Sequence, residues 1–436
     1  MNLKMTGQLA ASEGDAREDY RALVCLFLGG GNDSFNMLVP DDETGYAEYA
    51  SSRGDLALAR EDLLPLNPGT LPDGRTLGVH PSLPVVRELY DGGKAAFVSN
   101  VGTLVEPTSL GQYQNQSVAL PSGLFSHSDQ AMHWQSSLPD DRSPLSGWGG
   151  RMGDLLKELN EVGGVSMNIS LAGINLFQSG EDVTPFAIGT NGAIKLIHWN
   201  QSSWLPHRQA MEGVLAAEYA NLFEQTFARM KREAISANLE FDEALSASAD
   251  PVSEFSAGNP VSKQLKMVAR TIAARSQLGA CRQTFFVNMG GWDLHNDLDV
   301  SHPALLSTID TAIGEFQAAM AELQIEDRVT LFTASDFART LSSNGGGTDH
   351  AWGGNQIVVG GAVGSGLYGT YPDLALGSVL DTGRGRLIPT TSVDEYFCDL
   401  ALWMGVSPSS MGAVLPNLHR FHDVMADGAP LGLFNS

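Results

Sequence analysis

The chain has 436 residues, 43% of them apolar, which is enough to form the core of one large α/β domain or of two domains. Its formal net charge of −24 argues against nucleic acid as a partner, because phosphate binding requires a cationic face, and against adhesion to anionic lipid. No apolar stretch is long enough to span a bilayer.

The first segment, residues 1–20, is polar and lacks the apolar core of a signal peptide. We expect it to be a flexible segment ahead of the fold, and it is also compatible with the remnant of a removed leader. The chain has three cysteines, none in a Cys-x-x-Cys pair, and all lie in or beside apolar segments. They predict buried thiols and not a disulfide framework.

A first strand is predicted over residues 22–28, a continuous apolar run typical of a strand buried on both faces. It ends in Gly-Gly-Gly-Asn followed by Asp33, a sequence that permits a tight turn. Residues 41–77 are polar and interrupted by Pro and Gly, so they predict irregular loops with short helices. A short helix over 83–90 and a second strand over 95–101 follow.

A helix is predicted over residues 126–136, with Ser126 as N-cap and Asp129 three residues on, a variant of the capping box. A hydroxyl at a helix N-terminus is a candidate nucleophile, because unpaired N–H groups and the helix dipole favour its ionised form. Plain capping explains Ser126 equally well. An amphipathic helix over 148–159 and short strands over 165–171 and 185–188 come next.

The centre of the chain is helical. Apolar residues recur at helical spacing over about 207–245 and again over 261–278, and we interpret the block around 205–280 as a helical insertion. Strands and helices then alternate, with strands over 284–288, 328–333 and 356–363 and helices over 303–323 and 393–404. This alternation predicts an α/β fold with a mostly parallel central sheet flanked by helices on both faces.

Acidic and imidazole side chains follow several of these strands. Asp293 and His295, as alternate residues of an extended segment, point to the same side, and His350 lies in a Gly-rich loop. Because ligands bind at the carboxyl ends of parallel strands, we expect these groups and Asp336 to meet around a divalent metal ion, with zinc and calcium both candidates. The alternatives are structural, with Asp33 as a turn residue and Asp336 as a helix cap.

Five stretches resemble the bacterial family known as domain of unknown function 1501. They are LFLGGGNDSFNMLVP, LFSHSDQ, GGWDLHNDL, TASDFARTLSSNGGGTDHAWGGNQIVVGGAV and GRLIPTTSVDEYFCDLALWMGV. In the order of its motifs this family is similar to the alkaline phosphatase and sulfatase superfamily. The resemblance implies one alkaline phosphatase-like domain over residues 21–436. It also implies an extracytoplasmic location, because relatives usually carry a twin-arginine export leader.

The resemblance also implies roles for individual residues. The metal ligands would be Asp33, Asp293, His295, Asp336 and His350, and the catalytic residues Ser126, His127 and Arg339. Ser126 would be the nucleophile, and Arg339 or Arg151 would hold anionic oxygens. The chain departs from the superfamily in its Asp-x-His spacing, in Phe337 where a His would follow Asp336, and in lacking a diagnostic nucleophile motif. His127, Asp129 and Asp349 could compensate.

Two functions follow from this pattern. The first is a metal-dependent hydrolase of phosphate or sulfate esters, in which Ser126 attacks in line. Its substrate would be an anionic small molecule or a polysaccharide ester. The second is a non-catalytic binding or assembly protein that keeps the fold with a degenerate site, as Phe337 suggests. One metal ion is at least as compatible with these residues as two.

Overall fold

The computed structural model describes residues 19–160, 163–194, 196, 198–199 and 201–435. The predicted flexible segment, residues 1–20, therefore lies outside the described residues except for its last two. The strands of the main sheet are β1 (Arg21–Gly29), β5 (Ala95–Gly102), β6 (Asn168–Ser170), β7 (Phe186–Gly189), β8 (Gly192–Ala193), β9 (Arg282–Gly290), β10 (Val329–Ser335), β11 (Gly354–Val359), β12 (Gly366–Tyr368) and β13 (Thr391–Ser392).

Among the described residues these strands form one ten-stranded sheet in the order β12–β5–β11–β10–β1–β9–β6–β7–β8, with β13 beside β5. The central run from β10 through β1, β9 and β6 to β7 is parallel. Strand β11 is antiparallel to both of its neighbours, β10 and β5. The predicted α/β class with a mostly parallel sheet is confirmed.

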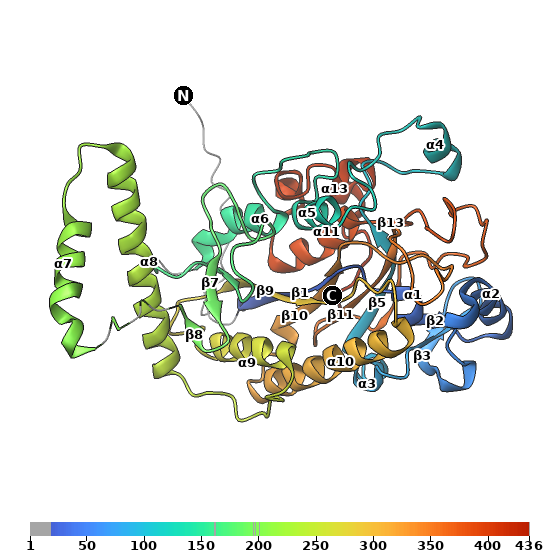
Figure 1. Ribbon diagram of the computed structural model, residues 1–436, viewed down its shortest axis with the longest axis horizontal. Helices are drawn as coiled ribbons and strands as arrows, with labels where there is room; N and C mark the ends of the chain where they lie inside the picture. The colour runs from blue at the N-terminus through green and yellow to red at the C-terminus, as the bar shows by residue number, and fades with distance from the viewer. Residues whose placement is uncertain (1–18, 161–162, 195, 197, 200, 436) are drawn as a thin grey trace.

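Helices cover both faces of the sheet (Figure 1). On one side lie α3 (Pro84–Asp91), α9 (Pro260–Ala273) and α10 (Leu298–Glu322), and on the other α5 (His127–Ser136), α6 (Trp148–Leu156) and α11 (Val393–Met404). Strand β1 shows why its sequence is a continuous apolar run. Val24 and Leu26 belong to one hydrophobic cluster, whereas Leu23, Cys25 and Phe27 belong to the other.

Residues 41–77 contain helix α2 (Glu43–Arg53), in agreement with the predicted short helices, but also strands that were not predicted. The segment contributes to a small antiparallel sheet of β2 (Leu38–Pro40), β4 (Thr76–Val79) and β3 (Leu64–Thr70). Strand β3 contains two prolines and pairs only along one edge, which is where a strand tolerates proline. The remaining α-helices are α1 (Ser34–Met37), α4 (Leu110–Asn115), α12 (Met411–Val414) and α13 (Val424–Asp427).

The first part of the block predicted around residues 205–280 is a hairpin of α7 (Leu205–Ala216) and α8 (Leu222–Ala247) that projects from the body at the left of Figure 1. The last part, α9, differs from the predicted insertion because it packs against β9 and α10 in the main core. The end of α8 is anchored in the core by Phe241 and Leu245, but large apolar side chains farther out are exposed. Phe223, for example, is 84% exposed. None of the described helices combines the length and apolarity needed to cross a bilayer.

Candidate metal centre

The carboxyl ends of three parallel strands lie in register. Leu28 of β1 pairs with Ser335 of β10, and Gly29 with Gly290 of β9, so the segments after these strands start at one edge of the sheet. Gly30 has φ +122°, and a Cβ there would lie 2.5 Å from the backbone nitrogen of Asp293. Glycine therefore allows the chain after β1 to approach Asp293 closely. The backbone N–H of Gly30 in turn donates to the carboxylate of Asp336 at 3.2 Å.

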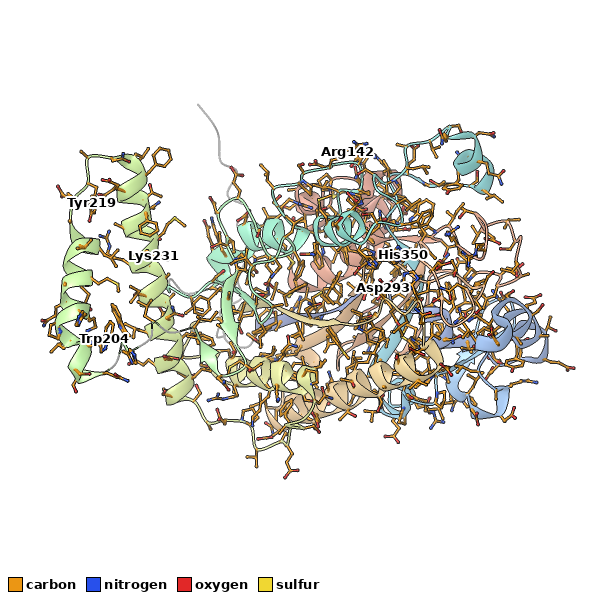
Figure 2. The ribbon with its side chains drawn as sticks, in the orientation of Figure 1. Arg142, Trp204, Tyr219, Lys231, Asp293 and His350 are labelled. Atoms are coloured by element: carbon orange, nitrogen blue, oxygen red, sulfur yellow. The ribbon has the colours of Figure 1, made fainter. Side chains whose placement is uncertain are left out.

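Four side chains converge at this edge. Ligand atoms of His127, Asp293 and His350 all lie within 4.8 Å of one another. The Nε2 atoms of His127 and His350 are 3.1 Å apart, and the Nε2 atom of His295 is also 3.1 Å from that of His350. Oδ1 of Asp293 lies 3.0 Å from His295 Nε2 and 3.3 Å from His350 Nε2. Figure 2 shows Asp293 and His350 side by side.

The outer nitrogen of each imidazole faces an acceptor. His127 Nδ1 lies 2.7 Å from Asp336 Oδ2, His295 Nδ1 lies 3.1 Å from Asp349 Oδ1, and His350 Nδ1 lies 2.8 Å from the Phe125 carbonyl oxygen. Each acceptor requires a proton on Nδ1, so in a neutral ring the Nε2 atom carries a lone pair. The lone pairs of His127 and His295 therefore both face that of His350, beside the carboxylate of Asp293, an arrangement that a cation stabilises.

The distances fit a small metal ion. In a tetrahedral site with metal–nitrogen bonds of about 2.0–2.1 Å, neighbouring ligand atoms are about 3.3–3.4 Å apart. The separations of 3.1–3.4 Å among the ligand atoms of His127, Asp293 and His350 are within a few tenths of this value. His295 adds a nitrogen 3.0 Å from Asp293 Oδ1 and 3.1 Å from His350 Nε2. A carboxylate or carbonyl behind each imidazole is also the usual outer partner of a metal-bound histidine.

Arg339 positions Asp293. Its guanidinium is fully buried and donates to Asp293 Oδ1 at 2.7 Å and to the Thr348 carbonyl oxygen at 2.6 Å. Burial alone would raise the pKa of Asp293, but the hydrogen bond and charge of Arg339 outweigh it and hold that pKa below its usual value. The sequence suggested that Arg339 holds the oxygens of a substrate. The structure instead engages it with protein acceptors, away from solvent.

Two neighbouring groups have perturbed pKa values. Burial lowers the pKa of His350, against the opposing effect of the Phe125 carbonyl, and so favours the neutral imidazole that binds metals. Burial would raise the pKa of Asp349, but hydrogen bonds from Asn344 and Arg384 and the charge of Arg384 lower it to about 2. The anionic Asp349 thereby keeps the proton of His295 on Nδ1.

Phe337, which directly follows Asp336 in the chain, lies beside the converging imidazoles. Its buried ring packs against the imidazoles of His127 and His350, with centroid distances of 4.7 and 4.6 Å. It supplies no ligand and forms an apolar wall behind the two rings. This wall favours one metal position over two.

Two predicted ligands do not join the converging group. Asp33 is buried in an ion pair with Arg53, whose Nη2 lies 2.7 Å from its Oδ2, and Thr348 donates to the same oxygen at 3.2 Å. Asp336 lies behind His127, as its hydrogen-bond acceptor. Arg53 comes from helix α2, in the segment predicted as irregular loops with short helices, and nothing in the pattern identified it as the partner of Asp33.

Ser126 is the N-cap residue of α5, as predicted, but its side chain makes no capping hydrogen bond and the capping box with Asp129 does not form. Its Oγ instead lies 3.2 Å from Ser128 Oγ. A cleft of about 770 Å³ beside the metal centre is lined by His127, Ser128, Asp293 and Asp336, and Ser126 does not line it. Arg151 donates to the carbonyls of Val414 and Ser136.

A family profile described as "Protein of unknown function (DUF1501)" matches residues 20–382. No curated protein matches the sequence.

Several solved structures are similar to the chain at low scores. A Bacteroides thetaiotaomicron protein from a locus for the metabolism of multiple glycosaminoglycans has a TM-score of 0.36 at 10% identity, covering 91% of this chain and 82% of its own. The PsFucS1 sulfatase from Pseudoalteromonas sp. has a TM-score of 0.34 at 10% identity, covering 90% and 69%. Ps i-CgsB in complex with k-i-k-neocarrahexaose has a TM-score of 0.32 at 10% identity, covering 92% and 77%. Such values carry no argument about chemistry, which rests on this chain's own residues.

Proposed function

The chain belongs to the family described as proteins of unknown function (DUF1501), and from this premise we propose that it is a hydrolase of phosphate or sulfate esters that uses one divalent metal ion. The observation that carries the proposal is the set of three imidazoles whose Nε2 atoms converge while each Nδ1 faces an acceptor. A core built only for stability would not direct the Nε2 atoms of His127 and His295 at that of His350 beside a carboxylate.

The proposed ligands are His127, His295, His350 and Asp293. A set rich in imidazole nitrogen suits zinc and related transition metals, whereas calcium prefers oxygen ligands throughout. Of the two metals that the sequence suggested, zinc and calcium, these ligands therefore favour zinc. Asp33, already neutralised by Arg53, is not needed as a ligand.

A bound divalent ion would act as a Lewis acid that withdraws charge from the ester oxygens. Arg339 holds Asp293 in place, and Asp336 and Asp349 fix the tautomers of their histidines. We assign the nucleophile to Ser126, at the N-terminus of α5 and next to His127. Its oxygen would lose a proton to solvent and bond to phosphorus or sulfur. The alcohol would leave, and water would then release the inorganic anion and restore the serine.

The acidity of the protein supports a role for the metal in attracting the substrate. With a net charge of −24, the chain as a whole repels an anion, so a local cation is needed to hold the reacting group. The proposal includes an extracytoplasmic location, which the family resemblance implies.

A second candidate function is metal binding without turnover. It is favoured by one observation, that Ser126 does not line the cleft and has its hydroxyl on Ser128. The two functions differ in what the Ser126→Ala variant should do.

Metal analysis combined with turnover assays tests the proposal. Protein reloaded with zinc should retain about one ion per chain, should lose it in the His350→Gln variant, and should hydrolyse an aryl phosphate or an aryl sulfate. Ser126→Ala should keep the ion and lose turnover. If the protein retains the ion but hydrolyses neither ester, the hydrolase proposal is wrong and metal binding without turnover is the function that remains. Absence of retained metal would overturn both.

A further inference from the structure

The cleft beside the metal centre has a distinct chemical character. It lies over the carboxyl ends of β1, β9 and β6, which are neighbours in the sheet, and Figure 1 shows β1 and β9 below α5. Its volume of about 770 Å³ is that of a site for a small organic molecule. The larger apolar side chains that line it are Phe27, Met132, Ile174, Leu176 and Phe286.

The cleft offers no positive charge. None of the described residues that line it is lysine or arginine, and its charged groups are Asp293 and Asp336. Its other polar side chains are His127, Ser128, Gln135, Asn175 and Asn288. The side-chain amide of Asn288 is exposed and makes no hydrogen bond with a described residue, so it is available to a ligand.

The nearest arginines are already engaged. Arg339 is buried against Asp293 and Thr348, and Arg384 forms an ion pair with Asp349. Arg386 donates to the carbonyl oxygen of His350 and lies over the ring of Phe125. A ligand that fills the cleft would therefore find one source of positive charge, the proposed metal ion, at one end.

We propose that the cleft binds the alcohol part of the ester, and that this part is uncharged and largely apolar, an aryl or alkyl group and not a polysulfated saccharide. This inference rests on the proposed function, because the cleft holds part of a substrate only if the protein hydrolyses esters. Of its apolar lining, Phe27 and Phe286 are buried, Met132 and Leu176 are half-buried, and Ile174 is 73% exposed. Each additional anionic group would face Asp293, Asp336 and the net charge of the chain with no cation to offset it.

Kinetics with matched esters test the inference. Zinc-loaded protein is assayed with 1-naphthyl phosphate and sulfate, with methyl phosphate and sulfate, and with a disulfated disaccharide. We expect the naphthyl esters to have kcat/KM values at least about tenfold above the methyl esters, because the ring buries apolar surface. Ile174→Asn and Met132→Gln, which remove apolar surface without adding charge, should raise KM for the naphthyl esters more than for the methyl esters. Preference of the wild type for the disaccharide would overturn the inference.

Metal-free binding separates this inference from the proposed function. Binding of 1-naphthol, followed by its fluorescence, needs neither metal nor turnover. Saturable binding that Ile174→Lys weakens about tenfold supports the apolar cleft even if no ester is hydrolysed. Val252→Lys, a change of another exposed aliphatic residue outside the cleft, is the matched control and should bind naphthol as the wild type does. No binding, or equal binding in Ile174→Lys, would overturn the inference while leaving the metal centre intact.

Discussion

Nδ1 of His127 lies 2.7 Å from Oδ2 of Asp336, although 209 positions separate the two residues in the chain. The contact joins the start of helix α5 to the end of strand β10. It turns the Nε2 atom of His127 towards His350 and Asp293. The carboxylate that the sequence suggested as a metal ligand thus acts on the metal centre through a histidine.

Asp336→Asn should weaken metal binding without abolishing it. The amide oxygen can still accept from His127 Nδ1, but the negative charge that strengthens the imidazole as a donor is lost. We expect zinc affinity to fall about 10- to 100-fold, measured by competition with a chromophoric chelator. Asp299→Asn is the matched control. It removes one negative charge from the first turn of α10, away from the site, and should leave the zinc affinity unchanged. Complete loss of metal in Asp336→Asn would instead indicate that Asp336 is a direct ligand.

Asp33→Asn should destabilise the protein and leave the metal stoichiometry unchanged. The side chains of Asp33 and Arg53 are 1% and 0% exposed, so removing one charge leaves the other buried and unpaired. We expect a loss of about 3–5 kcal/mol in the free energy of unfolding, measured by denaturant titration. Arg53→Met should cost a similar amount, and the double variant should cost less than the sum of the two. Loss of metal from folded Asp33→Asn protein would restore Asp33 as a ligand.

Much of the fold could be predicted because burial on both faces produces continuous apolar runs. Strand β1 and helix α11 begin and end within one residue of the predicted bounds. The small sheet of β2, β4 and β3 could not be predicted, since its strands are short and one carries two prolines. Helix α10 begins at Leu298, five residues ahead of the predicted start at Pro303. The prediction took the proline as the first helical residue, but the proline lies inside the first turns of the helix.

For the site, the sequence could predict which side chains follow the strands, but not the role of each side chain. Asp293, His295 and His350 follow strands or lie in a Gly-rich loop, and these three do converge. Whether an acid binds a metal or supports a ligand depends on partners far away in the sequence. Arg53 reaches Asp33 and the Phe125 carbonyl reaches His350, and neither contact leaves a local signal in the sequence.

Asp394→Asn should stabilise the protein at neutral to alkaline pH. Asp394 is fully buried in α11, and burial raises its pKa to about 7 against the opposing effects of Ser137 and Arg151. The folded state therefore binds this proton more tightly than the unfolded state, whose carboxyl has a pKa of about 3.9. The stability of the wild type should fall as pH rises from about 4 to 7 and then level off.

The asparagine variant lacks this titration, so its advantage should be near zero at about pH 4 and should reach on the order of 2–4 kcal/mol at about pH 8, by denaturant titration. Asp399→Asn serves as the control. Asp399 accepts from the backbone N–H groups of Leu431 and Leu433, so its replacement should destabilise the protein at both pH values. An Asp394→Asn advantage that is the same at both pH values would contradict this account.

The outer part of the α7–α8 hairpin should contribute little to the stability of the core. Phe223, Phe227 and Met230 recur at helical spacing on α8 and are 84%, 61% and 59% exposed. Replacing all three with serine or glutamine should change the free energy of unfolding by less than about 1.5 kcal/mol, because each is a surface change. Phe241→Ser, in the buried end of the same helix, should cost about 3–5 kcal/mol. A large loss from the outer triple variant would show that the hairpin folds as part of the core and not as an insertion upon it.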